Sequence, residues 1–247
     1  MTHIRLLIPG ELRTDSELEL DAERAHYIGR VLRLKPGDRL SVFNGDHGEF
    51  DARVLRMAKN SAVLLAGESR PTATESPLRV QLVQGISRGE RMDFVVQKAT
   101  ELGVKRISPV FTEHGVVRLD DERAAKRREH WQRVVESACE QSGRIRPPLV
   151  DRPVTLKQFL GARPAATDVD LILKPGAAQP LASIAAPQTK ICLLVGPEGG
   201  FSGGEYGDAE VAGFGAVSLG PRVLRTETAA LAAIAILQAA WGDLAGR

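Results

Sequence analysis

The sequence contains few of the residues that build covalent cross-links or metal sites. Among its 247 residues there are only two cysteines, Cys139 and Cys192, and they fall in segments with a helix and a strand pattern. This distribution predicts neither a disulfide framework nor a zinc site. None of the five histidines has the spacing of a metal-ligand pair such as HxxxH, so we expect no metal cofactor.

Long apolar runs and a large excess of one charge are also missing. No stretch approaches the roughly 20 residues that a membrane-spanning helix needs, and the start MTHIRLLIPGELR lacks the pattern of a signal peptide. We therefore expect a soluble protein of the reducing cytoplasm that does not enter membranes. Because the net charge is only +2, a nucleic-acid partner has to be argued from local residues and not from overall charge.

Two regions of the chain have different patterns. Residues 1–70 contain short strand patterns separated by turn signals, which predicts a small β-barrel domain. Residues 71–77 are rich in proline, serine and threonine, as linkers are. Residues 78–247 alternate strand and helix patterns, which predicts an α/β domain with a parallel sheet.

Buried strands and capped helices are predicted in the second region. Strand patterns that are apolar on both faces are typical of parallel strands covered by helices. One helix is predicted to begin with a capping box of Ser87 and Glu90 and to end at Gly103. The predicted strands include 169–173, 190–196 and 216–220, and the predicted helices are 87–103, 121–141 and 227–241.

Glycine-bearing segments follow two of these strands. GPEGGFSGGE follows the strand 190–196, and GPRVLRTETAALAAIAIL follows the strand 216–220. Ligands of open α/β sheets bind outside the carboxyl ends of the strands, so both loops are expected to border one crevice. The first loop lacks the Lys-Ser or Lys-Thr pair of a Walker loop and the GxGxxG fingerprint. This disfavours a diphosphate ligand and with it a nicotinamide dehydrogenase.

Polar residues open the last helix, which is otherwise almost uniformly apolar. Arg225, Thr226 and Glu227 stand at its start, and each polar group buried there without a partner would cost about 1–3 kcal/mol. Thr226 and Glu227 could cap the helix and complement its dipole, whereas Arg225 suits capping less well. Capping and ligand binding are both open for this segment.

The two loop segments resemble the cofactor-binding motifs of the RsmE family of SPOUT methyltransferases, which modify uridine N3 in 16S ribosomal RNA. The likeness extends to HYIGRVLRLKPGDRLSVFNGDHGEF, RMDFVVQKATELGV and ESACEQSGR, and so covers nearly the whole chain. It implies a PUA-like β-barrel, a SPOUT-type trefoil-knotted domain and a homodimer. It also implies S-adenosyl-L-methionine as cofactor and 16S ribosomal RNA, or the small ribosomal subunit, as substrate.

The resemblance further implies a set of site residues. Because charged side chains stand beside the predicted crevice, we expect Arg225 to stabilise a uracil anion or steer a phosphate, and Glu227 or Glu198 to accept the N3 proton. The expected cofactor-binding residues are Leu173, Gly196, Pro197, Glu198, Gly199, Gly200, Leu219, Gly220, Val223, Leu224, Arg225 and Thr228. Because phosphate recognition needs cations, the expected RNA-binding residues are Arg5, Arg30, Arg33, Lys98, Arg118 and Arg144.

Two other functions stay open at this point. Another SPOUT activity, such as methylation of the ribose 2′-O of RNA, would have nearly the same sequence chemistry. A non-catalytic RNA-binding or ribosome assembly factor would bind RNA without the cofactor, and the two complete glycine loops argue against it.

Overall fold

The chain forms two compact units in the computed structural model. One unit joins Met1–Glu75 with Cys139–Pro147, and the other joins Ser76–Ala138 with Pro148–Arg247; we call them the β domain and the α/β domain. The predicted boundaries treat each domain as one continuous segment, whereas the β domain also includes the end of a long helix. The structure describes residues 4–46, 48–117, 119–162, 167–185 and 189–245.

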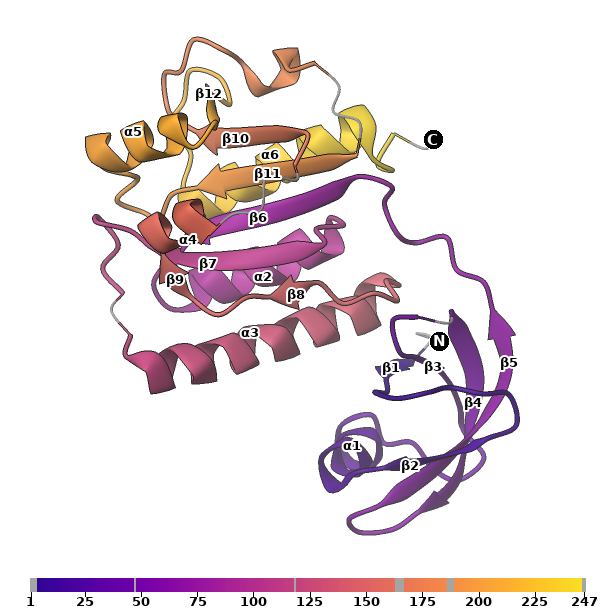
Figure 1. Cartoon of the computed structure of the whole chain (residues 1–247). Coiled ribbons are helices and arrows are strands. Elements are labelled where there is room, and N and C mark those ends of the chain that lie inside the picture. Colours follow the sequence, from indigo (N-terminus) through magenta and orange to yellow (C-terminus); the bar gives the residue numbers. More distant parts are fainter. Residues whose placement is uncertain (1–3, 47, 118, 163–166, 186–188, 246–247) are drawn as a thin grey trace. The chain divides into compact units, whose positions relative to one another are not determined.

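The β domain is built on a five-stranded sheet (Figure 1). Its strands run in the order β1-β3-β4-β5-β2, and all neighbours are antiparallel except β1 and β3. In the described residues β1 and β2 stay unpaired with each other, so the predicted small barrel takes the form of a half-barrel sheet. The bounds are β1 Arg5–Leu7, β2 Glu17–Leu20, β3 Arg39–Phe43, β4 Glu49–Met57 and β5 Ala62–Arg70.

Alternation along the strands places one face of this sheet in a core. In β4, for example, Phe50, Ala52 and Val54 are buried and Arg53 is exposed. The short helix α1 (Ala22–His26) begins at Asp21, whose side chain accepts a hydrogen bond from the Arg24 backbone N–H, and continues as a π-helical turn. Ile28 in that turn is fully buried, whereas Val31 is 59% exposed.

The α/β domain has a parallel sheet in the order β12-β10-β11-β6-β7-β8, with β9 pairing with β7. Figure 1 shows helices α2 and α6 on one face of this sheet and α4 and α5 on the other. The parallel sheet predicted from the apolar strands is therefore confirmed. The strands are β6 Arg79–Gly85, β7 Arg106–Phe111, β8 Leu149–Val150, β9 Val154–Thr155, β10 Val169–Leu173, β11 Lys190–Val195 and β12 Gly215–Val217. The helices are α2 Glu90–Glu101, α3 Asp121–Ser142, α4 Leu156–Ala162, α5 Gly203–Val211 and α6 Thr226–Trp241, with a 3₁₀ turn at Leu181–Ser183.

The ends of α2 differ in how well the sequence predicted them. Gly103 has a φ of 85° just beyond the helix, as the predicted left-handed end requires. The predicted capping box of Ser87 and Glu90 was wrong, because the N-cap is Gly89 with a φ of 56° and no side-chain cap. A backbone that needs positive φ at Gly89 begins the helix later than the sequence pattern indicated.

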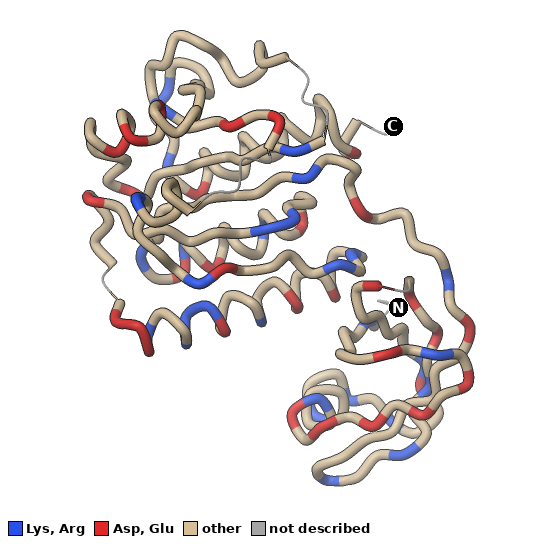
Figure 2. The backbone as a smooth tube through the Cα atoms, viewed as in Figure 1, with Lys and Arg blue, Asp and Glu red and all other residues tan. Residues whose placement is uncertain are grey.

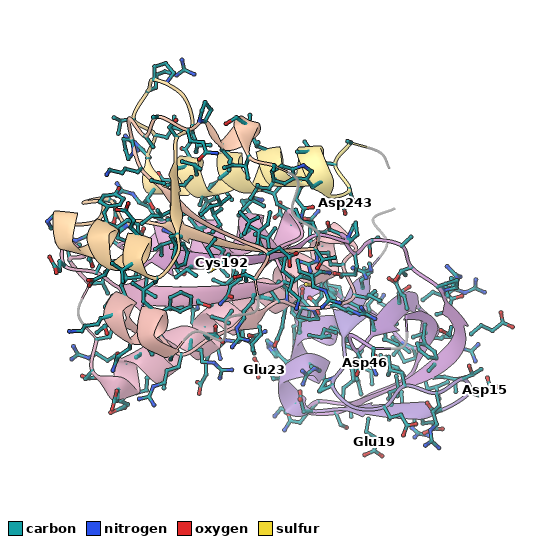
Figure 3. The ribbon with its side chains drawn as sticks, turned by 45° about the horizontal axis from the view of Figure 1, so that its top comes forward. Asp15, Glu19, Glu23, Asp46, Cys192 and Asp243 are labelled. Carbon is teal, nitrogen blue, oxygen red and sulfur yellow. The ribbon has the colours of Figure 1, made fainter. Side chains whose placement is uncertain are left out.

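Two features are absent from the described residues. No helix there is long and apolar enough to cross a bilayer, and no group of three metal-ligating side chains comes together. Cys192 lies inside the α/β domain, on β11, and is fully buried (Figure 3).

Candidate functional site

Three neighbouring strands of the α/β domain end at one cavity of about 440 Å³. Residues after β10, β11 and β12 form its walls, together with the first turn of α6 and single side chains from α2 and α5. This is the carboxyl edge of a parallel sheet, where α/β proteins bind ligands. The lining residues are Arg91, Leu173, Lys174, Pro175, Val195, Gly196, Pro197, Glu198, Gly200, Tyr206, Val217, Leu219, Gly220, Arg222, Val223, Leu224, Arg225, Thr226, Glu227 and Ala229.

The segment 196–200, which we call the first loop, depends on close backbone packing. A Cβ on Gly85, at the end of β6, would lie 2.4 Å from Cδ of Pro197 and 2.6 Å from its nitrogen, so only glycine fits there. Gly200 then takes a φ of 68°, a conformation that costs glycine little. Ser202 and Glu205 form the predicted capping box that opens α5.

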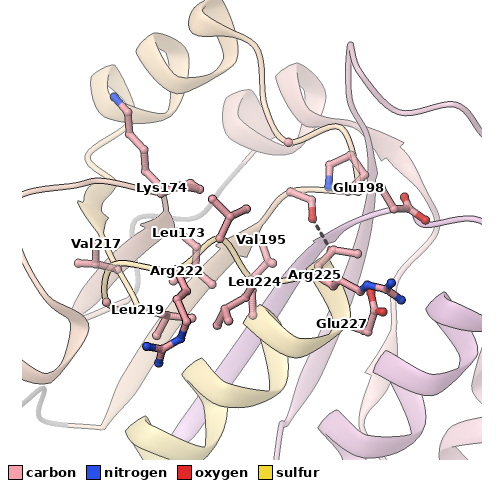
Figure 4. A pocket seen from close by; sticks show the side chains of 18 of the residues that line it. Leu173, Lys174, Val195, Glu198, Val217, Leu219, Arg222, Leu224, Arg225 and Glu227 are labelled. Carbon is pink, nitrogen blue, oxygen red and sulfur yellow. Dashed lines mark hydrogen bonds between the residues drawn. The ribbon is translucent and has the colours of Figure 1, made fainter.

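Apolar and charged side chains occupy different parts of the cavity (Figure 4). In that view Glu198, Arg225 and Glu227 lie on one side, and Lys174 and Arg222 lie on the other. Of the labelled apolar side chains, Leu173, Val195 and Leu224 lie between these two groups, and Val217 and Leu219 lie on the side of Lys174 and Arg222. A ligand that fits must therefore combine an apolar part with polar or charged ends.

Glu198 is held by donors at the cavity rim. Its Oε1 accepts hydrogen bonds from the Arg88 backbone N–H at 3.1 Å and from the Arg91 guanidinium at 2.9 Å. Burial acts to raise the pKa of Glu198, but these donors and its own backbone N–H together lower the pKa below its usual value. A carboxylate that is already paired and stays ionised is a weak proton acceptor.

Glu227 has a different environment in the first turn of α6. Its Oε2 is buried and has no hydrogen-bond partner among the described residues. Neighbouring Thr226 is not a helix cap, since the N-cap is Arg225 and the Thr226 hydroxyl donates to the Gly196 carbonyl at 2.5 Å. Buried polar atoms without partners are rare in proteins and usually need a ligand or water. Glu227 therefore offers the cavity an unsatisfied acceptor.

Tyr206 and Lys174 form part of the opposite wall. The Lys174 ammonium lies 4.9 Å from the centre of the Tyr206 ring, within cation–π range. Burial, and secondly the charge of Glu205, raise the pKa of the Tyr206 hydroxyl, so it stays protonated at neutral pH. Neither residue was predicted; Lys174 could have been found because it directly follows β10 at the ligand edge.

Most residues predicted for the cofactor and for catalysis lie on this cavity. All three proposed catalytic residues line it, but two predicted cofactor residues, Gly199 and Thr228, do not. A Cβ on Gly199 would meet the His114 backbone oxygen at 2.9 Å, so this glycine serves packing against another loop. Thr228 is exposed on α6. Arg91 and Arg222 also line the cavity and were missed. Only the tertiary fold brings Arg91 there, whereas Arg222 could have been found because it lies between the predicted residues Gly220 and Val223.

The residues predicted to bind RNA lie in different environments. The Arg5 side chain is 8% exposed and donates to Glu49 and to the carbonyl of Cys139, and the Arg144 side chain is 3% exposed and paired with Glu75. Their prediction as RNA contacts is corrected here, because both guanidinium groups are buried in contacts inside the β domain. Lys98 is paired with Glu101 at 2.8 Å.

The short segment after α1 carries two of the predicted cations that the structure describes. Arg30 and Arg33 are both exposed. Arg118 lies outside the described residues. Figure 2 shows that basic and acidic residues are interspersed along both units.

Known proteins resemble the whole chain. A family model described as an RNA methyltransferase domain matches residues 74–238, and one described as an RNA methyltransferase PUA domain matches residues 20–65. The ribosomal RNA small subunit methyltransferase E of Buchnera aphidicola (subsp. Schizaphis graminum) is 34% identical over 97% of each chain. The protein of that name from Bacillus subtilis is 30% identical over 88% of each chain.

Solved structures agree with these relatives. A Legionella pneumophila protein solved with the bound cofactor SAM is 42% identical, with a TM-score of 0.94, covering 99% of this chain and 100% of that one. Ribosomal RNA small subunit methyltransferase E from Neisseria gonorrhoeae, bound to S-adenosyl methionine, is 40% identical, with a TM-score of 0.91, covering 98% and 99%.

The fold and the cavity define a two-domain α/β protein that takes its ligand at the strand ends of a parallel sheet. The family models and relatives add the chemistry that such a site serves in similar proteins. The chain belongs to the RsmE family of RNA methyltransferases. The predicted fold class, a SPOUT-type domain behind a PUA-like β domain, is thereby confirmed, and the trefoil knot itself stays a prediction.

Proposed function

We propose that this protein transfers the methyl group of S-adenosylmethionine to N3 of a uridine in 16S ribosomal RNA, in the cytoplasm. The observation that carries the proposal is the cavity, where an unsatisfied buried carboxylate oxygen of Glu227 and the guanidinium of Arg225 lie beside the first loop. Two relatives that carry the small subunit methyltransferase name align with 97% of this chain, so the comparison extends over both domains.

The residues that line the cavity fit the cofactor. A volume of about 440 Å³ lies within the range of about 300–1,000 Å³ that is typical of small-molecule sites. Apolar side chains in the middle suit the cofactor's base and the carbon chain on its sulfur. Charged side chains at both ends suit the amino acid group of the cofactor and the uracil base that reacts. The first loop and residues 219–225, which we call the second loop, would hold the cofactor. When bound, it supplies an electrophilic methyl group.

The protein's own residues must then make the uridine nucleophilic. The N3 proton has to be removed, and each unit by which its pKa exceeds the ambient pH costs about 1.4 kcal/mol. Glu227 is better suited to accept this proton than Glu198, because Glu198 already accepts from Arg88 and Arg91. Arg225 has no ion-pair partner in the described part of the chain and can stabilise the uracil anion.

Single-turnover methylation tests these roles at saturating cofactor, with labelled S-adenosylmethionine and small ribosomal subunits. A positioned general base contributes about 10²–10⁴-fold, so Glu227→Gln is expected to slow the step by that range, and Arg225→Ala by a similar factor. Glu198→Gln is the matched control and should slow it less. Rates near wild type for Glu227→Gln and Arg225→Ala would remove both from the mechanism.

Analysis of the modified nucleosides separates the alternatives. The proposal predicts N3-methyluridine at one position of 16S ribosomal RNA. A ribose-methylated product would assign the protein to another SPOUT activity. Absence of S-adenosylmethionine binding in calorimetry, with RNA binding retained, would leave a non-catalytic assembly factor.

RNA contacts are proposed for Arg30 and Arg33, because both are exposed in the β domain. Each phosphate contact changes the slope of log affinity against log salt by about 0.7–0.9. Replacing both arginines with glutamine should therefore weaken RNA binding. It should also reduce the steepness of this slope by up to about twice the change for one contact. Arg56→Gln, which removes an exposed arginine paired with Glu17, is the control and should leave the slope unchanged.

A homodimer is proposed as the working form. Support comes from apolar surface on and near α6, where Val223 is 80% and Ile236 is 36% exposed. Light scattering should give twice the 26.7 kDa mass of one chain, and a mass of one chain at micromolar concentration would contradict the dimer.

A further inference from the structure

A glutamine behind the cavity connects the two loops. Gln84 is the penultimate residue of β6 and is completely buried, yet it does not line the cavity itself. Its side-chain Nε2 donates to the Thr226 hydroxyl at 3.0 Å, to the Gly85 carbonyl at 3.0 Å and to the Gly196 carbonyl at 3.3 Å. One amide thus contacts the end of β6, the start of the first loop and the first residue of α6.

The orientation of this amide is fixed by its surroundings. Two of the three partners are carbonyl oxygens, which only accept, so a reversed amide would place oxygen against oxygen. The Thr226 hydroxyl has a single hydrogen and uses it to donate to Gly196, so it can only accept from Gln84. The Oε1 atom of Gln84 has no partner within the described residues, and the side chain is held through donation alone.

These contacts determine where the proposed catalytic residues lie. Gly196 begins the first loop, whereas Thr226 stands between Arg225 and Glu227 in sequence and opens α6. The hydrogen bonds of Gln84 to both therefore set the separation between the loop that would hold the cofactor and the residues that would act on the uridine. Errors of about 1 Å in such a separation can cost about 10²-fold in rate.

We propose that Gln84 is a positioning residue, whose buried amide fixes the first loop to the start of α6 and so aligns Arg225 and Glu227 with the bound methyl donor. This inference rests on the proposed function. It assigns a role in the reaction to a residue that does not line the cavity. Gln84 therefore does not contact the reacting atoms.

The test compares two buried glutamines of the same domain. Gln238 on α6 is also completely buried, donates to the Leu102 carbonyl at 3.0 Å and accepts from Ser76 at 2.6 Å, and none of these residues lines the cavity. Gln84→Met and Gln238→Met each remove one buried amide at nearly constant length. Three quantities are measured for both: the melting temperature, the dissociation constant of S-adenosylmethionine by calorimetry, and the single-turnover rate at saturating cofactor.

Both variants should melt at lower temperature than wild type, because both lose buried hydrogen bonds. Only Gln84→Met is expected to raise the dissociation constant at least tenfold and to lower the saturated rate at least tenfold. If the dissociation constant and the saturated rate of Gln84→Met lie within twofold of those of Gln238→Met, the positioning role is overturned.

A second variant covers the case in which Gln84→Met does not fold. Thr226→Val removes the hydroxyl that joins Gln84 to Gly196 and should also raise the dissociation constant about tenfold. If Thr226→Val binds the cofactor as wild type does, the inference fails. Wild-type protein that binds no S-adenosylmethionine would instead refute the proposed function, so the two failures are distinguishable.

Discussion

Gly85 provides the sharpest test of how the cavity is built. An added Cβ would lie 2.4 Å from Cδ and 2.6 Å from the nitrogen of Pro197, and 3.0 Å from the carbonyl carbon of Gly196. Non-bonded carbon atoms normally approach to about 3.5–4.0 Å, so the first loop would have to move by about 1 Å. Two of these three atoms are backbone, and the third belongs to a proline ring, so rotating a side chain cannot relieve the contact.

Gly85→Ala should therefore lower both stability and function. Overpacking typically costs about 1–3 kcal/mol, which corresponds to a melting temperature lower by about 2–12 °C for a domain of this size. A loop displaced by about 1 Å should reduce kcat/KM by about 10²-fold, and S-adenosylmethionine affinity should fall with it. Calorimetry measures the melting temperature and the cofactor affinity, and steady-state methylation measures kcat/KM.

Gly207 offers a control for the same change. It lies inside α5, an added Cβ would meet nothing within 4 Å, and its φ is not positive. Gly207→Ala should stabilise the protein by about 0.5–1 kcal/mol through helix propensity and leave cofactor affinity unchanged. Cofactor affinity of Gly85→Ala within twofold of Gly207→Ala would refute the claim that close approach of β6 shapes the first loop.

Three further predictions concern other contacts. Arg5→Ala should cost about 3–5 kcal/mol in urea unfolding, because it leaves the largely buried Glu49 carboxylate without its guanidinium, whereas an exposed RNA contact would cost little. Ser202→Ala should cost about 0.5–2 kcal/mol by removing the capping box of α5. The pKa of Glu198 is lowered in the folded protein, so its pairing with Arg91 stabilises above the ordinary value of 4.5 and is lost as pH falls further. The melting difference between wild type and Glu198→Gln should accordingly shrink on acidification from about pH 6 to pH 3, and a difference that grows would contradict this sign.

The sequence predicted the parts of the fold that depend on local pattern. The strand β10 and the helix α6 lie within a residue of their expected ends, since turn residues and apolar periodicity define them locally. Among the described residues the barrel is open between β1 and β2, and the sequence does not predict this opening, because closure depends on pairing between distant strands and not on any one segment. Residues 139–147 join the β domain for a similar reason.

The candidate site was predictable where it follows strand ends. Leu173, Gly196 and Leu219 line the cavity because parallel strands present their carboxyl ends together. Arg5 was assigned wrongly, since its partners Cys139 and Arg144 are more than 130 positions away along the chain. Gln84 could not be recognised either, because a polar residue in a strand pattern gives no sign of the three acceptors that surround it.

The central claim is that the first and second loops enclose the methyl donor. A crystal structure of the protein with S-adenosylmethionine tests it most directly. The account predicts the cofactor in the cavity at the ends of β10, β11 and β12, with its methyl group on the side of Arg225 and Glu227. Cofactor bound anywhere else on the chain, with this cavity empty, would contradict it.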